Sequence, residues 1–178
     1  MRLPFNKWFH KLMPQTRPRF GVPAAAATIL SLYALDQATK WLVIRALPFD
    51  SERPVIPGFF TLVHWVNTGA AFSSFSEKNG VFIVISAITL VALAVFAIRG
   101  AFQQAATRVA LCLLSAGVLG NLTDRIRHHH VVDFLLFNLH VPFANPWPAF
   151  NVADSCICIA AGILVVSAWR EERNSGRF

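Results

Sequence analysis

Four aspartates lie in or beside apolar runs of this sequence, where an ionised carboxylate is costly. They are Asp36, Asp124, Asp133 and Asp154. A charged side chain at the bilayer centre costs about 2.5–3.5 kcal/mol on insertion scales, so such residues are rare and usually functional. Asp133 and Asp154 have no basic neighbour in sequence to neutralise them. We therefore favour a catalytic role over a structural role for these two.

A pair of carboxylates in a low-dielectric site predicts acid–base chemistry on an amide bond. Two such groups cannot both ionise easily, so one pKa rises and the pair shares a proton. The ionised partner can take a proton from water as it attacks a carbonyl carbon. The protonated partner can stabilise the tetrahedral intermediate. This chemistry needs no metal, no cofactor and no nucleophilic serine or cysteine.

The other two aspartates have simpler alternatives. Asp36 and Lys40 are four residues apart, so an ordinary helical ion pair also explains them. Asp124 is next to Arg125 and three residues after Asn121, so a role in orienting its neighbours also explains it. Both alternatives stay open at this point.

Metal binding is not expected. The three cysteines lie inside apolar runs, and none has a second Cys or His pair at zinc-ligand spacing. His128, His129 and His130 are consecutive, so they cannot easily point at one ion, and a turn at the membrane surface is the better interpretation.

Composition predicts an all-α membrane protein with four transmembrane helices. Hydrophobic residues make up 55% of the 178 residues and charged residues only 14%, against about 25% charged in soluble domains. Apolar runs predict spans at about residues 20–44, 81–98, 105–122 and 150–169. We expect a single membrane domain over residues 20–170, between a basic tail at 1–19 and a second tail at 171–178.

A small β element is expected between the first and second spans, over about residues 46–72. Proline and glycine punctuate this region, and residues 59–66 are rich in aromatic and β-branched side chains.

The basic residues predict the orientation of the chain, because Lys and Arg collect on the cytoplasmic side of spans. Ten lie in the tails and the loop between the second and third spans: Arg2, Lys7, Lys11, Arg17, Arg19, Arg99, Arg108, Arg170, Arg173 and Arg177. Five lie on the opposite side: Arg45, Arg53, Lys78, Arg125 and Arg127. Both termini are therefore expected in the cytoplasm, with the aspartates near the outer ends of the spans. Nucleic-acid binding is disfavoured, because the charges flank apolar runs and form no basic stripe.

Five sequence blocks, in order and within a four-span chain, resemble the lipoprotein signal peptidases, also called signal peptidase II. The resemblance covers about residues 20–170. The blocks are Asp36-Gln37-Ala38-Thr39-Lys40, Asn67-Thr68-Gly69-Ala70-Ala71-Phe72, Gly120-Asn121-Leu122-Thr123-Asp124-Arg125, Val131-Val132-Asp133-Phe134 and Phe150-Asn151-Val152-Ala153-Asp154-Ser155.

The resemblance implies that Asp133 and Asp154 form the catalytic dyad of an aspartic endopeptidase. It implies supporting or substrate-binding roles for Asp36, Lys40, Asn67, Asn121, Asp124, Arg125 and Asn151. The implied substrate is a prolipoprotein with a diacylglyceryl-modified cysteine, cut on the N-terminal side of that cysteine. The resemblance also implies an extracytoplasmic β-cradle after the first span, an inner-membrane location, contact with membrane lipid and inhibition by cyclic peptides of the globomycin type.

The sequence departs from the family in two places. Its basic tail is longer than the family needs, and His129 stands where members often have glycine. Two competing interpretations are a proton-coupled transporter and a non-catalytic anchoring protein. Transporter sites lie near the midplane, often in repeated halves, whereas these aspartates are predicted at span ends. An anchoring role leaves the dyad unexplained.

Overall fold

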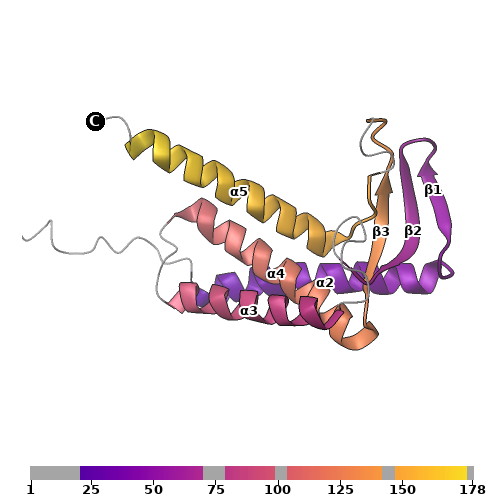
Figure 1. Cartoon of the computed structure of the whole chain (residues 1–178), viewed down its shortest axis with the longest axis horizontal. Coiled ribbons are helices and arrows are strands. Elements are labelled where there is room, and N and C mark those ends of the chain that lie inside the picture. Colours follow the sequence, from indigo (N-terminus) through magenta and orange to yellow (C-terminus); the bar gives the residue numbers. More distant parts are fainter. Residues whose placement is uncertain (1–20, 70–78, 99–103, 142–146, 176–178) are drawn as a thin grey trace, which may run out of the picture.

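The computed structural model describes residues 21–69, 79–98, 104–141 and 147–175. It contains four long helices and a three-stranded sheet. The helices form a bundle and the sheet stands at one end of it, opposite the C-terminal end of the last helix (Figure 1). The predicted tail at residues 1–19 lies outside the described residues.

Helix α4 (Ala105–His128) is the centre of the bundle. It packs against α2 (Val22–Ala46), α3 (Asn79–Ile98) and α5 (Val152–Ser175). Small side chains allow this close packing, because a β-carbon added at Gly117 would lie 2.5 Å from the carbonyl oxygen of Ala153. The outer helices expose apolar side chains instead, and α3 buries no residue within the protein.

Three of the helices, α3, α4 and α5, are long and apolar enough to cross a membrane. Helix α2 has 25 residues, a length of about 37 Å at 1.5 Å per residue. It differs from the other three in holding Asp36 and Lys40 buried in its middle. The structure therefore gives a mostly helical protein with three clear candidate spans, and the fourth span stays a prediction.

The sheet is antiparallel, in the order β1 (Glu52–Ile56), β2 (Phe60–Asn67) and β3 (Val131–Phe137). Its first two strands fall in the region where a β element was predicted. The third strand comes from the segment between α4 and α5, which was not predicted as a strand. Strand β3 also bridges to Phe150 just before α5, so the sheet is tied to the start of that helix.

Helix boundaries also differ from the predicted spans. The third predicted span ended near residue 122, but α4 continues to His128, since Asp124 and Arg125 are buried in the helix and do not end it. Helix α5 continues to Ser175, into the region predicted as a tail. Asp133 was placed at the outer end of the third span and instead lies on β3.

His129 ends α4 in a left-handed conformation, with φ 64° and ψ 8°. Its backbone N–H donates to the carbonyl oxygen of Arg125 at 3.2 Å. This is the position after a helix that favours glycine, so a histidine here has a conformational cost. His128 is the last residue of α4, and His129 and His130 form the turn between α4 and β3.

Candidate active site

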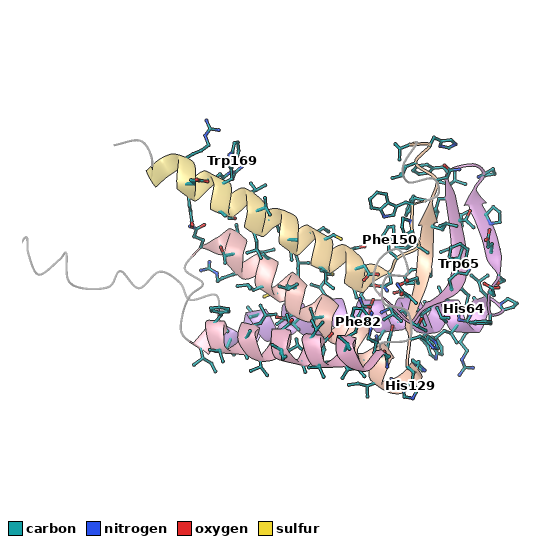
Figure 2. The ribbon with its side chains drawn as sticks, viewed as in Figure 1. His64, Trp65, Phe82, His129, Phe150 and Trp169 are labelled. Carbon is teal, nitrogen blue, oxygen red and sulfur yellow. The ribbon has the colours of Figure 1, made fainter. Side chains whose placement is uncertain are left out.

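The predicted site residues come together where the sheet meets the bundle. The middle of α2, the C-terminal part of α4, the first turn of α5, and strands β2 and β3 converge there. Figure 2 shows Trp65 and Phe150 at this end of the molecule and Trp169 at the other. All nine side chains named from the sequence lie within one hydrogen-bonded cluster.

Asp133 is 4% exposed and faces Trp65 across the β2–β3 ladder. Its two carboxylate oxygens accept hydrogen bonds from different asparagines. The side-chain amide of Asn151 donates to Oδ1 at 2.7 Å, and that of Asn67 donates to Oδ2 at 3.1 Å. Strand β3 therefore fixes the backbone of Asp133, and two amides fix its carboxylate plane.

The pKa of Asp133 is raised from 3.8 to about 7. Burial is the main cause, because it removes water from the charged form. The negative charge of Asp154 raises the pKa further, whereas the two asparagine hydrogen bonds and the charge of Lys40 lower it. A carboxyl with this pKa can act as an acid or a base at neutral pH.

Asp154 lies in the first turn of α5 and forms a reciprocal cap with Asn151. The backbone N–H of Asn151 donates to Asp154 Oδ2 at 3.2 Å, and the backbone N–H of Asp154 donates to Asn151 Oδ1 at 2.9 Å. The other carboxylate oxygen, Oδ1, accepts from the amide of Asn121 at 2.7 Å. Asn151 therefore contacts both Asp133 and Asp154.

Lys40 forms the predicted ion pair with Asp36, at 2.9 Å, but the pair is buried and extends to a second helix. Its ammonium also lies 2.8 Å from Asp124 Oδ2 and donates to Asn121 Oδ1 at 3.0 Å. An ammonium group only donates, so the oxygen of the Asn121 amide must face it. The NH₂ group of Asn121 is thereby directed at Asp154.

Asp36 and Asp124 each bind the backbone N–H of the residue that precedes one of the paired aspartates. Asp36 Oδ1 accepts from Ala153 at 2.9 Å, and Asp124 Oδ2 accepts from Val132 at 3.4 Å. The orienting role considered for Asp124 fits this contact.

Arg125 is 8% exposed and reaches the loop after β2. It donates from Nη2 to the carbonyl oxygen of Gly69 at 3.0 Å, and its guanidinium lies over the ring of Phe82 at 5.0 Å. The backbone N–H of Gly69 in turn donates to Asn67 Oδ1 at 3.0 Å. Arg125 thus supports the loop that holds Asn67.

Three residues of the cluster were missed by reasoning from the sequence. Gln37 contacts both Asp36 and Asp124. A β-carbon at Gly120 would lie 2.5 Å from Asp36 Oδ2. Asn79 donates to the carbonyl oxygen of Arg125 at 3.1 Å. Gln37 and Gly120 both belong to the quoted blocks, which was the available signal.

The arrangement can support general acid–base hydrolysis. The charge of Asp154 raises the pKa of Asp133, so the two carboxylates interact. Within the described ranges, no group of three His, Cys, Asp or Glu side chains is placed to hold a metal ion.

Comparison with known proteins agrees with this geometry. A family model described as signal peptidase (SPase) II matches residues 28–170. The lipoprotein signal peptidase of Syntrophotalea carbinolica is 41% identical over 156 residues, covering 86% of this chain and 94% of that protein. The corresponding protein of Neisseria gonorrhoeae is 37% identical over 154 residues, covering 85% and 89%.

Solved structures give the same answer. A bacterial membrane enzyme determined by the in meso method at 2.3 Å resolution has a TM-score of 0.80 and 30% identity, and it covers 88% of this chain and 94% of its own. A second, determined by the same method at 1.9 Å, has a TM-score of 0.73 and 31% identity, covering 83% and 93%. The chain therefore belongs to the signal peptidase II family.

Proposed function

We propose that this chain is the aspartic endopeptidase that removes the signal peptide from diacylglyceryl-modified prolipoproteins. Cleavage falls on the N-terminal side of the modified cysteine, and Asp133 and Asp154 form the dyad. Family membership supports a protease of lipoprotein maturation in the bacterial inner membrane. The observation that carries the residue assignment is the side-chain amide of Asn151, which donates to Asp133 and accepts from the backbone N–H of Asp154 in the first turn of α5.

The proposed reaction uses one proton shared by the dyad. The ionised carboxylate takes a proton from a water molecule, and the oxygen of that water attacks the scissile carbonyl carbon. The protonated carboxyl hydrogen-bonds the carbonyl oxygen, and the tetrahedral intermediate forms. When it collapses, the C–N bond breaks and the leaving amine takes a proton from the dyad. One water is consumed and the dyad returns to its starting protonation.

The supporting residues have two proposed tasks. Asn67, Asn121 and Asn151 orient the two carboxylates through their amides. The buried charges Asp36, Lys40, Asp124 and Arg125 fix those amides and the adjacent backbone.

Helix α3 supports a proposed level of the dyad in the membrane. Its 20 residues extend about 30 Å, the thickness of the hydrocarbon core. Asn79 begins α3 and contacts the carbonyl oxygen of Arg125, so Arg125 lies near one edge of the hydrocarbon. Asn121 is one helical turn inside that edge and binds Asp154. The dyad is therefore proposed about one turn, roughly 5 Å, below the membrane surface.

We assign this edge to the outer face, with four spans and both termini in the cytoplasm. Ten basic residues lie in the tails and the loop between the second and third predicted spans, against five on the opposite side, and this difference supports the assignment. At this depth the acyl chains of the substrate stay in lipid while water reaches the scissile bond. A cyclic peptide of the globomycin type would bind against the same carboxylates.

One assay tests the proposed activity. The purified protein is incubated with a diacylglyceryl-modified prolipoprotein, and the products are identified by mass. The expected product begins at the lipidated cysteine. A substrate left intact, or cut at another bond, would refute the proposal. Reporter fusions at Arg173 and Ser51 test the orientation, and labelling on the same side would refute the four-span arrangement.

A further inference from the structure

We propose that Gln37 is a positioning residue for the dyad, because its side-chain amide fixes the carboxylates of Asp36 and Asp124 on which both dyad aspartates depend. The proposal rests on the proposed function. It adds a glutamine to the charged residues and asparagines that support the dyad there. Gln37 itself contacts neither dyad residue in the described hydrogen bonds.

The amide of Gln37 crosses from α2 to α4. Its Nε2 lies 3.0 Å from Asp124 Oδ1, 3.1 Å from Asp36 Oδ2 and 3.3 Å from the carbonyl oxygen of Gly120. An amide nitrogen carries two N–H donors. Three acceptors, two of them carboxylates, therefore compete for these two donors, and the nitrogen is held in one orientation.

Lys40 cannot replace this contact. Its ammonium has three N–H donors, which face Asp36 Oδ2, Asp124 Oδ2 and Asn121 Oδ1. Among the described residues, the remaining oxygen of Asp124, Oδ1, receives its hydrogen bond from Gln37. Loss of the amide leaves that oxygen buried without a donor, which is costly for a charged group.

A carboxylate that turns to find another donor disturbs the backbone it holds. Asp124 Oδ2 accepts from Val132 N–H, and Asp36 Oδ1 accepts from Ala153 N–H. These two residues directly precede the dyad aspartates in the sequence. Gln37 thus acts on Asp154 through Asp36, and on Asp133 through Asp124.

A simple packing role for Gln37 makes a different prediction. Gln37 is half-buried between two helices, so it also fills space. Gln37→Met keeps similar volume and removes both donors. Gln37→Glu keeps the shape and can donate only while its carboxyl is protonated. If hydrogen-bond donation matters, the two variants must differ in their dependence on pH.

The charged groups around position 37 determine how Q37E behaves. Asp36 and Lys40 face it from α2, and Asp124 faces it from α4. Asp154 on α5 is linked to Lys40 through Asn121. A new ionised carboxyl would repel two carboxylates already present, so loss of its proton both removes the donor and adds repulsion.

The experiment measures kcat and KM for a diacylglyceryl-modified prolipoprotein across a range of pH. We expect Q37M to lower kcat by about tenfold at every pH, the effect of losing a hydrogen bond to a charged group, with KM nearly unchanged. For Q37E, the activity relative to wild type should rise as pH falls and drop as pH rises. If the cleavage activity of a single Q37E preparation recovers when the pH is lowered, the variant protein is folded.

The matched control is Gln104→Met, which makes the same chemical change at the other end of α4, where Gln104 contacts Glu171. It should leave kcat unchanged. Wild-type kcat in both Q37M and Q37E would overturn the proposal, and so would equal losses in the two variants at every pH, which indicate packing alone. Failure of the proposed function would show separately, as a wild-type protein that does not cleave.

Discussion

Asn151 donates a hydrogen bond from its side-chain amide to Asp133 Oδ1 at 2.7 Å, across 18 residues of sequence. The same residue caps α5 together with Asp154. One asparagine therefore connects the strand that carries one aspartate with the helix that carries the other. Asn151 therefore holds the two carboxylates in a fixed arrangement.

Asp133→Asn and Asp154→Asn should each abolish cleavage while the protein stays folded. We expect a loss on the order of a thousandfold or more, and the double variant should be little worse than either single variant because the dyad acts as a unit. The measurement is cleavage of a lipidated prolipoprotein. Asp124→Asn is the comparison, with a partial loss expected. Near-normal activity in either dyad variant contradicts the assignment.

Cleavage should decline as pH rises above about 7, because the pKa of Asp133 is raised to about 7. A raised pKa means that the shared proton is held below that pH and lost above it. The hydrogen bond from Asn67 lowers this pKa, so Asn67→Ala should move the decline to higher pH. Asn138→Ala, beyond the end of β3, should leave it in place. A shift of the Asn67 variant to lower pH would show that this explanation is wrong.

Gly120→Ala should reduce both stability and activity. The added β-carbon would lie 2.5 Å from Asp36 Oδ2 and 3.3 Å from the β-carbon of Ala153. Overpacking of this kind costs about 1–3 kcal/mol. Thermal unfolding in detergent measures the effect. Gly162→Ala is the matched control, because nothing lies within 4 Å of its added β-carbon, and equal effects of the two changes would refute the steric argument.

His129→Gly should stabilise the protein by about 1 kcal/mol, because an L-residue with side chain pays that amount in the left-handed region. The φ angle of His129 is 64°. Gly58, with φ 75° and no atom near its added β-carbon, gives the reverse test. Gly58→Ala should therefore lower the thermal midpoint. A lower midpoint for His129→Gly would mean that the histidine side chain contributes more than its backbone costs.

Removing the diacylglyceryl group from the substrate should sharply reduce cleavage. The proposed dyad lies about one helical turn inside the membrane edge, where two acyl chains can hold the scissile bond. Withdrawing acyl chains from lipid costs about 0.8 kcal/mol per CH₂. The test compares one prolipoprotein with and without its lipid. Equal rates would reject this explanation of depth, even if the peptidase assignment stands.

The structure brings all nine predicted site residues together, whereas several predicted boundaries of helices and strands differ. Asp36 and Lys40 were recognisable as a helical pair because spacing within one helix is visible in sequence. The contacts of Lys40 with Asp124 and Asn121 join residues more than 80 positions apart, and no local pattern reveals such pairing. The family resemblance brought these residues together in the prediction, and the spatial links were found only in the structure.

Strand β3 was missed for a physical reason. Its sequence, Val131 to Phe137, is apolar and buried on both faces over most of its length, so the alternation that signals a half-buried strand is absent. Its partner strand also lies about 70 residues earlier in the chain. The end of α4 was misjudged because buried charges interrupt the apolar run while the backbone continues as helix.

Asp36 and Asp124 accept hydrogen bonds from backbone N–H groups of other elements. This affects when the site can form during biogenesis. Asp36 leaves the ribosome long before Ala153, its partner 117 residues later. Until α5 is inserted, the backbone N–H of Ala153 and one oxygen of Asp36, Oδ1, lack the hydrogen bond that joins them. Asp154 itself lies on α5, so a chain that has inserted only its earlier helices lacks half of the proposed dyad. Activity of the proposed dyad therefore requires the last helix.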